Sequence, residues 1–357
     1  MKITLIFSAF IFSIVASANE LRLSRKEALA QGFKPFKFSK SISSSELPAQ
    51  AMAWPVKFID ASHTIGNSMP EYQNYGTEAY YHEGADLRVS PAREVTAPVA
   101  GFLQGDFYTY VTDQNTGEDK KYTKPYSDGG DTLYFEITIR TTEGFQLEMH
   151  HVNPESLPKN IIDLILRGGG EIRAGEVVGF AAIWPNSRAG ARYDHIHYNL
   201  ISPAGVYMNP EYFSQPLADE SAPLVKNIYA VYKDKTIEVL NQKLQGTPLE
   251  LIVSAIDMKG ENIYPLPPVL AEAAWGAKKT AWDFSKYFLN SLGGFPDIRE
   301  VYARNVRLSS GKTVTTKGDY SSAVFLFRLK TPAGASGPVT ITLKDSSENT
   351  TQVQLNE

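Results

Sequence analysis

The stretch DHIHYNLI, residues 194–201, decides the fold because polar and apolar side chains alternate along it. Successive residues of a β-strand point to opposite faces, so His195 and His197 would share one face. Three apolar side chains would face the other way: Ile196, Tyr198 and Leu200. The pattern predicts a strand that packs on one side and offers two imidazoles on the other. A lone His-x-His pair more often marks an exposed strand, so the other parts of the sequence must show whether these two histidines belong to a site.

The rest of residues 54–214 has the same β-rich texture. Short β-prone runs alternate with clusters of Gly, Pro and Asn, which is typical of antiparallel sheets. Besides residues 195–201, we expect strands at residues 94–103, 132–140, 145–152 and 176–182. A short helix is predicted at residues 158–166, followed by the three glycines 168–170. The polar segment 104–131 is predicted to be a long hairpin loop.

A polar, proline-flanked segment at residues 214–224 predicts a boundary between two domains. Beyond it we expect further short strands, at residues 227–232, 236–240, 249–257, 301–308, 323–330, 339–343 and 352–355. This spacing is typical of an immunoglobulin-like β-sandwich. The sequence therefore predicts a mainly β protein, with an antiparallel β-sheet domain at residues 54–214 and a sandwich at residues 222–357.

The first 18 residues have the composition of a signal peptide. Lys2 precedes an apolar run over residues 3–15, and residues 16–18 (Ala-Ser-Ala) are small, as signal peptidases require. The run is shorter than the roughly 20 residues that span a membrane. We therefore predict an exported protein, periplasmic or secreted, with no stable membrane span after cleavage. A polar, Ser-rich arm would follow at residues 19–53.

The composition excludes several classes of protein and site. The 357 residues include no cysteine, so disulfides, thiolate metal ligands and a cysteine nucleophile are excluded. Hydrophobic residues make up 43% and charged residues 21%, which is ordinary for a globular chain. The formal net charge of -4, without long runs of one sign, gives no reason to expect nucleic-acid binding. Any metal would be held by His, Asp, Glu and water.

Five of the six histidines fall into three short clusters, all within residues 54–214. The first cluster is HEGAD, residues 82–86. Gly84 would permit a close backbone approach there and let His82 and Asp86 point to one place. Imidazole nitrogen and carboxylate oxygen are both good zinc ligands. Alone, this pattern is common in surface loops.

The second cluster is MHHV, residues 149–152. In a strand, His151 would share a face with Met149, whereas His150 would lie on the other face. Only one of the two histidines should therefore join a site, and periodicity does not choose between them. The third cluster is the His-x-His pair at residues 195–197.

Taken together, the clusters resemble the lysostaphin/LytM-type zinc endopeptidases, which cut peptide cross-links in bacterial cell walls. That family has His-x-x-x-Asp, then a lone His often preceded two residues earlier by Tyr, then His-x-His. Residues 82–86, 149–152 and 195–197 match in that order. The resemblance covers roughly residues 54–212, and the ordered set is specific although each motif alone is weak. Further similar runs lie at residues 54–56, 95–101, 173–179 and 209–210.

The resemblance implies one zinc ion per chain, with His82, Asp86 and His197 as its ligands. Three protein ligands would leave a position for water, the pattern of a catalytic rather than a structural zinc. Zinc lowers the pKa of such a water to around 7, which supplies hydroxide at neutral pH. The implied activity is hydrolysis of peptide bonds in peptidoglycan, at stem peptides or cross-bridges.

Two further histidines are implied to be catalytic. The first of the His-x-His pair, His195, is one of them. With Met149 at the family's Tyr position, His151 is the other, and His150 is the alternative. These histidines would hold water, move protons and stabilise the charge on the carbonyl oxygen, in roles that the sequence does not divide.

Two other functions remain open. One is a catalytically inactive module that binds or regulates in the cell envelope, although all five family positions are filled here. The other is a zinc endopeptidase that acts on proteins. The chain departs from the family at Asp194, where Pro is usual, and over residues 105–130 and 186–193, which bears on substrate choice. Neither a His-Glu-x-x-His motif nor a Gly-x-Ser-x-Gly motif occurs.

Other conspicuous residues receive a structural interpretation. His63 is interpreted as a surface histidine, with a place in the substrate groove as the alternative. Arg188 and Arg192 could bind a substrate carboxylate, but at least one of them is interpreted as a solvated loop charge. Five aromatic residues are interpreted as packing residues rather than as a substrate groove or a carbohydrate-stacking surface: Tyr80, Tyr81, Tyr193, Trp275 and Trp282.

Overall fold

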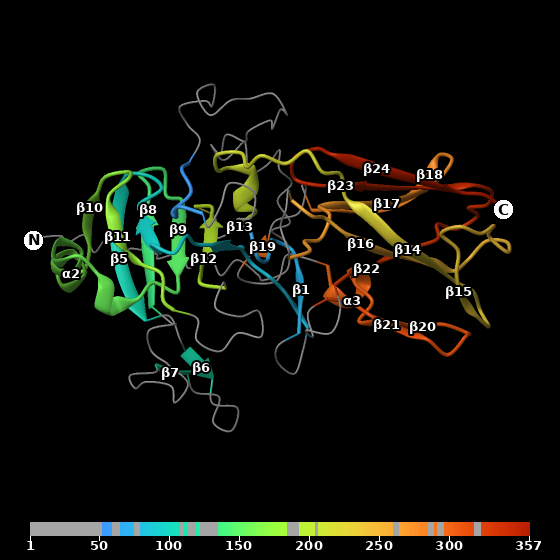
Figure 1. The fold of residues 1–357 in the computed structure, drawn as a ribbon, viewed down its shortest axis with the longest axis horizontal. Helices are drawn as coiled ribbons and strands as arrows, with labels where there is room; N and C mark the ends of the chain where they lie inside the picture. Colours follow the sequence, from blue (N-terminus) through green and yellow to red (C-terminus); the bar gives the residue numbers. More distant parts are fainter. Residues whose placement is uncertain are drawn as a thin grey trace, which may run out of the picture.

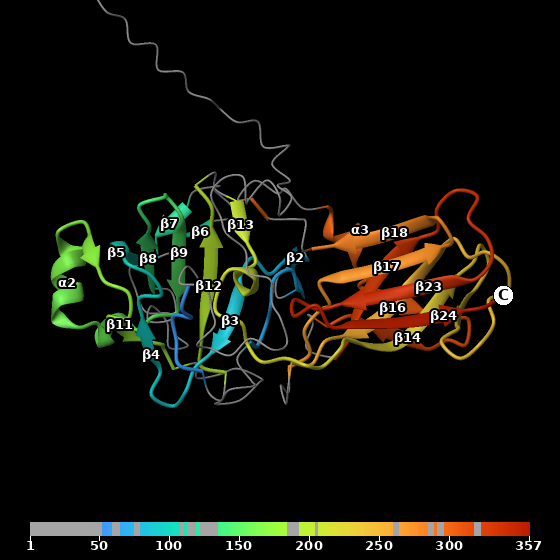
Figure 2. The same ribbon diagram turned by 90° about the horizontal axis from the view of Figure 1, so that it is seen from above.

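The described chain is mainly β, and its sheets are antiparallel, as the sequence predicts. Figures 1 and 2 show two lobes, one coloured mainly blue to yellow-green and the other mainly yellow to red. The computed structural model describes residues 52–58, 65–74, 79–107, 110–112, 119–121, 135–183, 193–203, 206–259, 264–284, 289–290, 296–317 and 323–357.

A large antiparallel sheet forms the first lobe. Within the described residues it has eight strands, in the order β10-β5-β8-β9-β12-β13-β19, and β3 pairs with β12 off this path. The strands are β3 (Ala85–Arg88), β5 (Gly101–Phe107), β8 (Phe135–Arg140), β9 (Gln146–His150), β10 (Gly170–Ile172), β12 (His195–Ile201), β13 (Val206–Met208) and β19 (Leu289–Asn290). Strand β12 has the predicted bounds, and its apolar side chains Ile196, Tyr198 and Leu200 are buried as alternation requires.

Smaller elements surround this sheet. They are β1 (Tyr72–Gln73), β2 (Tyr80–Tyr81), β4 (Glu94–Thr96), β6 (Tyr110–Thr112), β7 (Asp119–Lys121), β11 (Val177–Phe180), α2 (Lys159–Leu166), and the 3-10 helices η3 (Pro154–Ser156) and η4 (Pro210–Tyr212). The predicted helix is present as α2, and it packs Ile161 into the core. Gly168 and Gly169 follow it with positive φ angles of 88° and 119°, which favour glycine.

Two predicted elements of this lobe are wrong in their bounds. The single strand predicted at residues 94–103 is two strands, since β4 pairs with β11 whereas β5 belongs to the large sheet. Pro98 lies in the bend between them and has no N–H to donate, so a continuous ladder is interrupted there. The loop predicted at residues 104–131 begins with the last residues of β5 and contains β6 and β7. Pairing of β5 with β8 overrides the polar composition of these strand residues.

The second lobe is a β-sandwich of two four-stranded sheets. Their orders are β15-β14-β16-β22 and β18-β17-β23-β24, and apolar side chains such as Val253, Phe327 and Ile341 fill the core between them. The elements are β14 (Leu224–Val231), β15 (Thr236–Glu238), β16 (Glu250–Ile256), β17 (Leu270–Trp275), β18 (Lys278–Asp283), α3 (Ile298–Val301), β20 (Asn305–Arg307), β21 (Thr313–Thr315), β22 (Phe325–Lys330), β23 (Val339–Lys344) and β24 (Thr350–Leu355).

The sandwich differs from the prediction at one predicted strand and at three strands that were not predicted. The strand predicted at residues 301–308 is wrong: its first residue ends α3, and only Asn305–Arg307 is a strand. Asp297 caps α3 by accepting a hydrogen bond from the Arg299 N–H at 2.9 Å, which starts a helical turn. Strands β17, β18 and β21 were not predicted. In β17 the reason is the alanine-rich run LAEAAW, which has low β propensity.

The two lobes share side chains. Met69, Tyr72 and Tyr81 lie before the predicted boundary but belong to the core of the sandwich. Leu266 lies beyond that boundary and packs in the core of the first lobe. Because Tyr81 directly precedes His82, packing against the sandwich also holds the chain next to a predicted ligand.

Among the described residues, no helix has both the length and the apolar character needed to cross a membrane. Several predicted features lie outside the described residues: the signal peptide 1–18, residues 19–51 of the arm, His63, Arg188 and Arg192.

Candidate metal centre

The candidate site lies where three strands of the large sheet run side by side. Strand β12 pairs with both β3 and β9. His197 stands opposite Asp86 on β3 and opposite His150 on β9. Residues directly opposite each other in an antiparallel sheet point to the same face. Asp86, His150 and His197 therefore project together, as strand pairing alone requires.

The turn before β3 brings His82 to the same place. Gly84 passes so close to β12 that a Cβ atom there would collide with the carbonyl group of Tyr198 and the side chain of Asn199. Glycine alone allows this approach. The Nε2 atom of His82 lies 3.1 Å from Oδ1 of Asp86, four residues along the chain.

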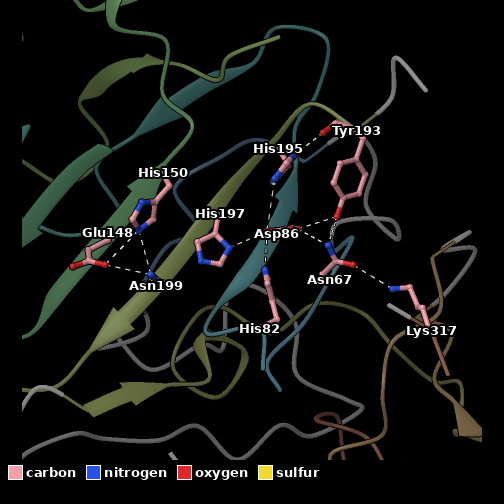
Figure 3. Close-up of polar contacts among 10 residues, drawn as sticks. All are labelled: Asn67, His82, Asp86, Glu148, His150, Tyr193, His195, His197, Asn199 and Lys317. Atoms are coloured by element: carbon pink, nitrogen blue, oxygen red, sulfur yellow. Dashed lines mark hydrogen bonds and ion pairs between the residues drawn. The ribbon is translucent and has the colours of Figure 1, made fainter. Parts of the chain in front are cut away.

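Three imidazoles surround one oxygen atom of Asp86 (Figure 3). Besides His82, the Nδ1 atom of His197 lies 3.0 Å from Asp86 Oδ1. The Nε2 atom of His195 lies 3.7 Å from the same oxygen. The ligand atoms of His82, Asp86 and His197 all lie within 4.8 Å of one another. The three residues that the sequence assigns as ligands are thus brought together in a cluster that is compatible with a metal ion.

The second oxygen of Asp86 is held by two hydrogen-bond donors. Asn67 Nδ2 donates to Asp86 Oδ2 at 2.5 Å, and the Tyr193 hydroxyl donates to it at 2.8 Å. The two oxygens of the carboxylate therefore have different partners. Oδ2 accepts hydrogen bonds from Asn67 and Tyr193, whereas Oδ1 faces the histidines. Such an arrangement orients a carboxylate for a metal and is a common supporting feature of metal sites.

A lysine from the sandwich completes this support. Lys317 Nζ donates to Asn67 Oδ1 at 3.2 Å and to Glu71 Oε1 at 2.7 Å (Figure 3 shows Lys317 and Asn67). Because Lys317 contacts the oxygen of the Asn67 amide, the amide nitrogen must face Asp86. Tyr264, also from beyond the predicted boundary, lies with its ring 5.4 Å from that of Tyr193. The second lobe therefore contributes directly to the surroundings of Asp86.

Replacing Lys317 with methionine will lower the free energy of unfolding by about 3–5 kcal/mol, because Glu71 is left as an unpaired buried charge. The Glu71 side chain is fully buried and that of Lys317 is 14% exposed, so little water is present to compensate. Denaturant unfolding measures the loss. Lys312→Met, at an exposed position nearby, is the matched control and should change little. A Glu71→Gln/Lys317→Met double variant should recover part of the loss; no recovery would contradict the ion-pair explanation.

The charge states of Asp86 and His197 suit metal binding, whereas His82 must give up its proton to become a ligand. Burial opposes ionisation of Asp86, but His82 and His195 outweigh it and hold the pKa of the carboxyl well below its usual range. Burial lowers the pKa of His197 to about 4. Burial also opposes protonation of His82, yet Asp86 and Glu71 outweigh it and raise the His82 pKa. At neutral pH Asp86 is therefore an anion and His197 is neutral, the states in which both act as ligands.

The chemistry and proximity of the donor atoms support the fit of a metal to this cluster. Two imidazoles and one carboxylate form a donor set that zinc accepts. The residues present are therefore compatible with a bound metal ion, and their chemistry fits the zinc that the resemblance implies.

The two histidines with implied catalytic roles lie next to each other beside this cluster. The rings of His151 and His195 are 4.9 Å apart. His195 Nδ1 lies 2.7 Å from the backbone carbonyl oxygen of Tyr193, so Nδ1 carries a proton and donates it. Its Nε2 atom is then the nitrogen that accepts a proton, and it is the one that faces Asp86.

His150 also lies close to the cluster. Strand alternation predicted that only one of His150 and His151 would do so. The ring of His150 is 5.3 Å from that of His197, and the ring of His151 is 6.4 Å from that of His197. Strand β9 ends at His150, and His151 has a φ angle of 67°, so the alternation breaks there. A left-handed conformation at a non-glycine residue is strained and frequently marks a functional site. His150 lies 3.3 Å from Glu136 and 3.4 Å from Glu148.

Comparisons with known proteins add little to this description. No protein-family model and no curated protein match the chain. Among solved structures, a chain of the SpoIIQ–SpoIIIAH pore-forming complex matches with 15% sequence identity over 47% of this chain and 93% of that chain. The TM-score is 0.29, which is too low to carry an argument about fold or function.

Proposed function

We propose that the protein is a zinc-dependent endopeptidase that cleaves peptide bonds in bacterial peptidoglycan. The observation that carries the proposal is the convergence of His82, Asp86 and His197 within 4.8 Å of one another. Two further histidines, His151 and His195, lie beside them at the positions that the resemblance to the lysostaphin/LytM family implies. Peptidoglycan stem peptides or cross-bridges are the proposed substrates, and the envelope or the exterior of the cell is the proposed location.

The proposal gives three residues the role of metal ligands. Asp86 supplies one negative charge, and His82 and His197 supply imidazole nitrogens. When bound, zinc supplies a Lewis acid and water of strongly lowered pKa. Asn67 and Tyr193 hold the carboxylate of Asp86 through Oδ2, so that Oδ1 keeps its orientation.

His195 and His151 perform the proton transfers of the proposed reaction. Hydrolysis joins the oxygen of water to the carbonyl carbon and breaks the carbon–nitrogen bond of the peptide. His195 Nε2 takes the proton from water, because its Nδ1 is engaged with the Tyr193 carbonyl. The same proton then goes to the leaving amine nitrogen. His151, on the side of His195, donates a hydrogen bond to the carbonyl oxygen as negative charge develops on it.

A digestion panel tests the proposed activity. Zinc-loaded protein is incubated with purified peptidoglycans of different cross-link types and, separately, with unfolded protein substrates. Mass analysis of the released fragments should show new amino termini within the stem peptides or cross-bridges. Cleavage of proteins without cleavage of peptidoglycan would favour the protein endopeptidase. Binding of zinc with no cleavage of any substrate would favour an inactive envelope module.

Removal of the metal will abolish hydrolysis and lower the unfolding temperature. A ligand present at about 100 times its dissociation constant stabilises the folded state by about 2.7 kcal/mol, and this contribution disappears in a chelator. Activity and thermal unfolding are measured before chelation, after it, and after addition of one equivalent of zinc. Full activity in a sample shown to contain no metal would rule out a metal-dependent mechanism.

A further inference from the structure

A second group of oxygen ligands lies where the linker between the lobes meets the sandwich. Asp219 lies in the linker, Asp257 directly follows β16, and Asp345 directly follows β23. One carboxylate oxygen from each lies within 4.8 Å of the others. This cluster, here called the junction cluster, shares no residue with the histidine site.

The junction cluster is buried and has unused oxygen atoms. Asp219 is 7% exposed, Asp257 and Asp345 are each 1% exposed, and the neighbouring Asn349 is 3% exposed. Among the described residues, no hydrogen-bond donor reaches Asp219 Oδ2, Asp257 Oδ1 or Asn349 Oδ1. An amide oxygen and two carboxylate oxygens buried without donors are unfavourable unless something else binds them.

Some oxygen atoms of the junction cluster already accept hydrogen bonds from the protein. These bonds show which oxygens are left for a ligand. Asp345 accepts hydrogen bonds at 2.8 Å from both the backbone N–H and the side-chain amide of Asn349. That amide also donates to the backbone carbonyl of Asp219 at 3.2 Å. Asp219 Oδ1 accepts from the N–H of Ser221 at 3.0 Å. The polypeptide therefore orients Asp219, Asp345 and Asn349, while it supplies no hydrogen-bond donor to Asp219 Oδ2, Asp257 Oδ1 or Asn349 Oδ1 among the described residues.

The charges near the junction cluster do not balance. Lys259 is the nearby cation, and it donates to Glu211 Oε2 and to Ser346 Oγ. If all were ionised, Glu211 and the three aspartates would carry four negative charges against the single positive charge of Lys259, which would leave three in excess. Burial opposes this ionisation: it raises the pKa of Asp257 well above its usual range and raises the pKa of Asp345 to about 6. A divalent cation is the ligand that removes this excess.

We propose that the junction cluster binds a calcium ion through the carboxylates of Asp219, Asp257 and Asp345 and the amide oxygen of Asn349. All the donors are oxygens, which suits a hard cation and not a metal that prefers nitrogen or sulfur. Calcium accepts six to eight oxygens in flexible geometry, whereas magnesium requires near-ideal octahedral geometry and retains several waters. The ligand oxygens come from the linker and from the ends of two strands, three separated segments. Such a set suits the flexible geometry of calcium better than the strict geometry of magnesium.

The position of the ion gives it a structural role. It joins the linker to the ends of β16 and β23, and Lys259 connects the same region to Glu211 in η4 of the first lobe. A chain without cysteine has no disulfide to fasten this junction. Calcium therefore replaces a covalent link and fixes the first lobe against the sandwich.

Calorimetric titration of the zinc-loaded full chain with calcium chloride tests this proposal, together with thermal unfolding. We expect one calcium per chain and a rise of about 5 °C in unfolding temperature at a saturating calcium concentration. Magnesium chloride at the same concentration should give a smaller rise. Absence of calcium binding, or an equal rise with magnesium, overturns the assignment.

Substitutions locate the ion. Asp257→Asn should abolish the calcium-dependent rise, and without calcium it should unfold at the same or a higher temperature because a carboxyl group whose ionisation burial opposes is removed. Asp219→Asn, in the linker, should also lose the rise. Asp234→Asn, at an exposed turn of the sandwich, is the matched control and should retain it. Zinc content should be unchanged in all three, which shows that each is folded. A full calcium response in Asp257→Asn or Asp219→Asn would exclude this site.

Discussion

Asp86→Asn will release the metal and reduce hydrolysis by at least about 10³-fold, which corresponds to about 4 kcal/mol. The substitution preserves the shape of the side chain but removes its charge. Asn67 and Tyr193 both donate to Oδ2, so the new NH₂ group avoids that side and occupies the position of Oδ1. A donor then faces the nitrogens of His82 and His197 where an anionic ligand stood, and a cation is repelled.

Metal analysis and peptidoglycan digestion of the same preparation measure this effect. Asp163→Asn is the matched control, since Asp163 lies on α2, is exposed and pairs only weakly with Lys159 across one helical turn. It should bind zinc and cleave substrate like the natural chain. Retention of about one zinc per chain by Asp86→Asn, with normal turnover, would remove Asp86 from the site.

His195→Gln will lower kcat by about 10²–10⁴-fold while the zinc content is unchanged. The His195 side chain is buried and lies beside the ligand cluster, with its Nε2 atom 3.7 Å from Asp86 Oδ1. Glutamine can still donate a hydrogen bond to the Tyr193 carbonyl, but it takes up no proton at neutral pH. The loss should therefore appear in kcat rather than in metal binding or KM.

A comparison of the adjacent histidines His150, the last residue of β9, and His151 completes this experiment. The ring of His151 lies 4.9 Å from that of His195, so His151→Gln should cause a similar loss in kcat. His150 contacts Glu136 and Glu148, and His150→Gln should have a smaller effect on turnover. A larger loss of kcat in His150→Gln than in His151→Gln would make His150, and not His151, the catalytic histidine. Loss of zinc in His195→Gln would make His195 a ligand rather than a proton carrier.

The sequence predicts most of the strands that carry the site, because alternation and turn residues are local signals. Strand β12 has its predicted bounds, and its pairing with β3 and β9 sets which side chains meet. Alternation fails at His151, where a positive φ angle ends the regular strand. The prediction that a loop begins at residue 104 fails for a different reason, because the polar residues at the end of β5 are held by pairing with β8 rather than by their own propensity.

The support of Asp86 by distant residues was not predictable from local patterns. Lys317 lies 250 positions from Asn67 in the sequence, and nothing in its neighbourhood marks it as part of a site. Asn67 lies in a polar run that reads as an ordinary loop. Only the packing of the β1–β2 hairpin into the core of the sandwich brings these residues together. The junction cluster is similar, since its three aspartates come from segments that only the folded chain unites.

The central claim is that His82, Asp86 and His197 hold a catalytic zinc ion. Anomalous diffraction from crystals of the full chain, recorded on both sides of the zinc absorption edge, tests it most directly. We predict one strong peak, at about 2.0–2.2 Å from one nitrogen each of His82 and His197 and one oxygen of Asp86. Absence of a zinc peak between these three side chains, in crystals of protein that cleaves peptidoglycan, would contradict the claim.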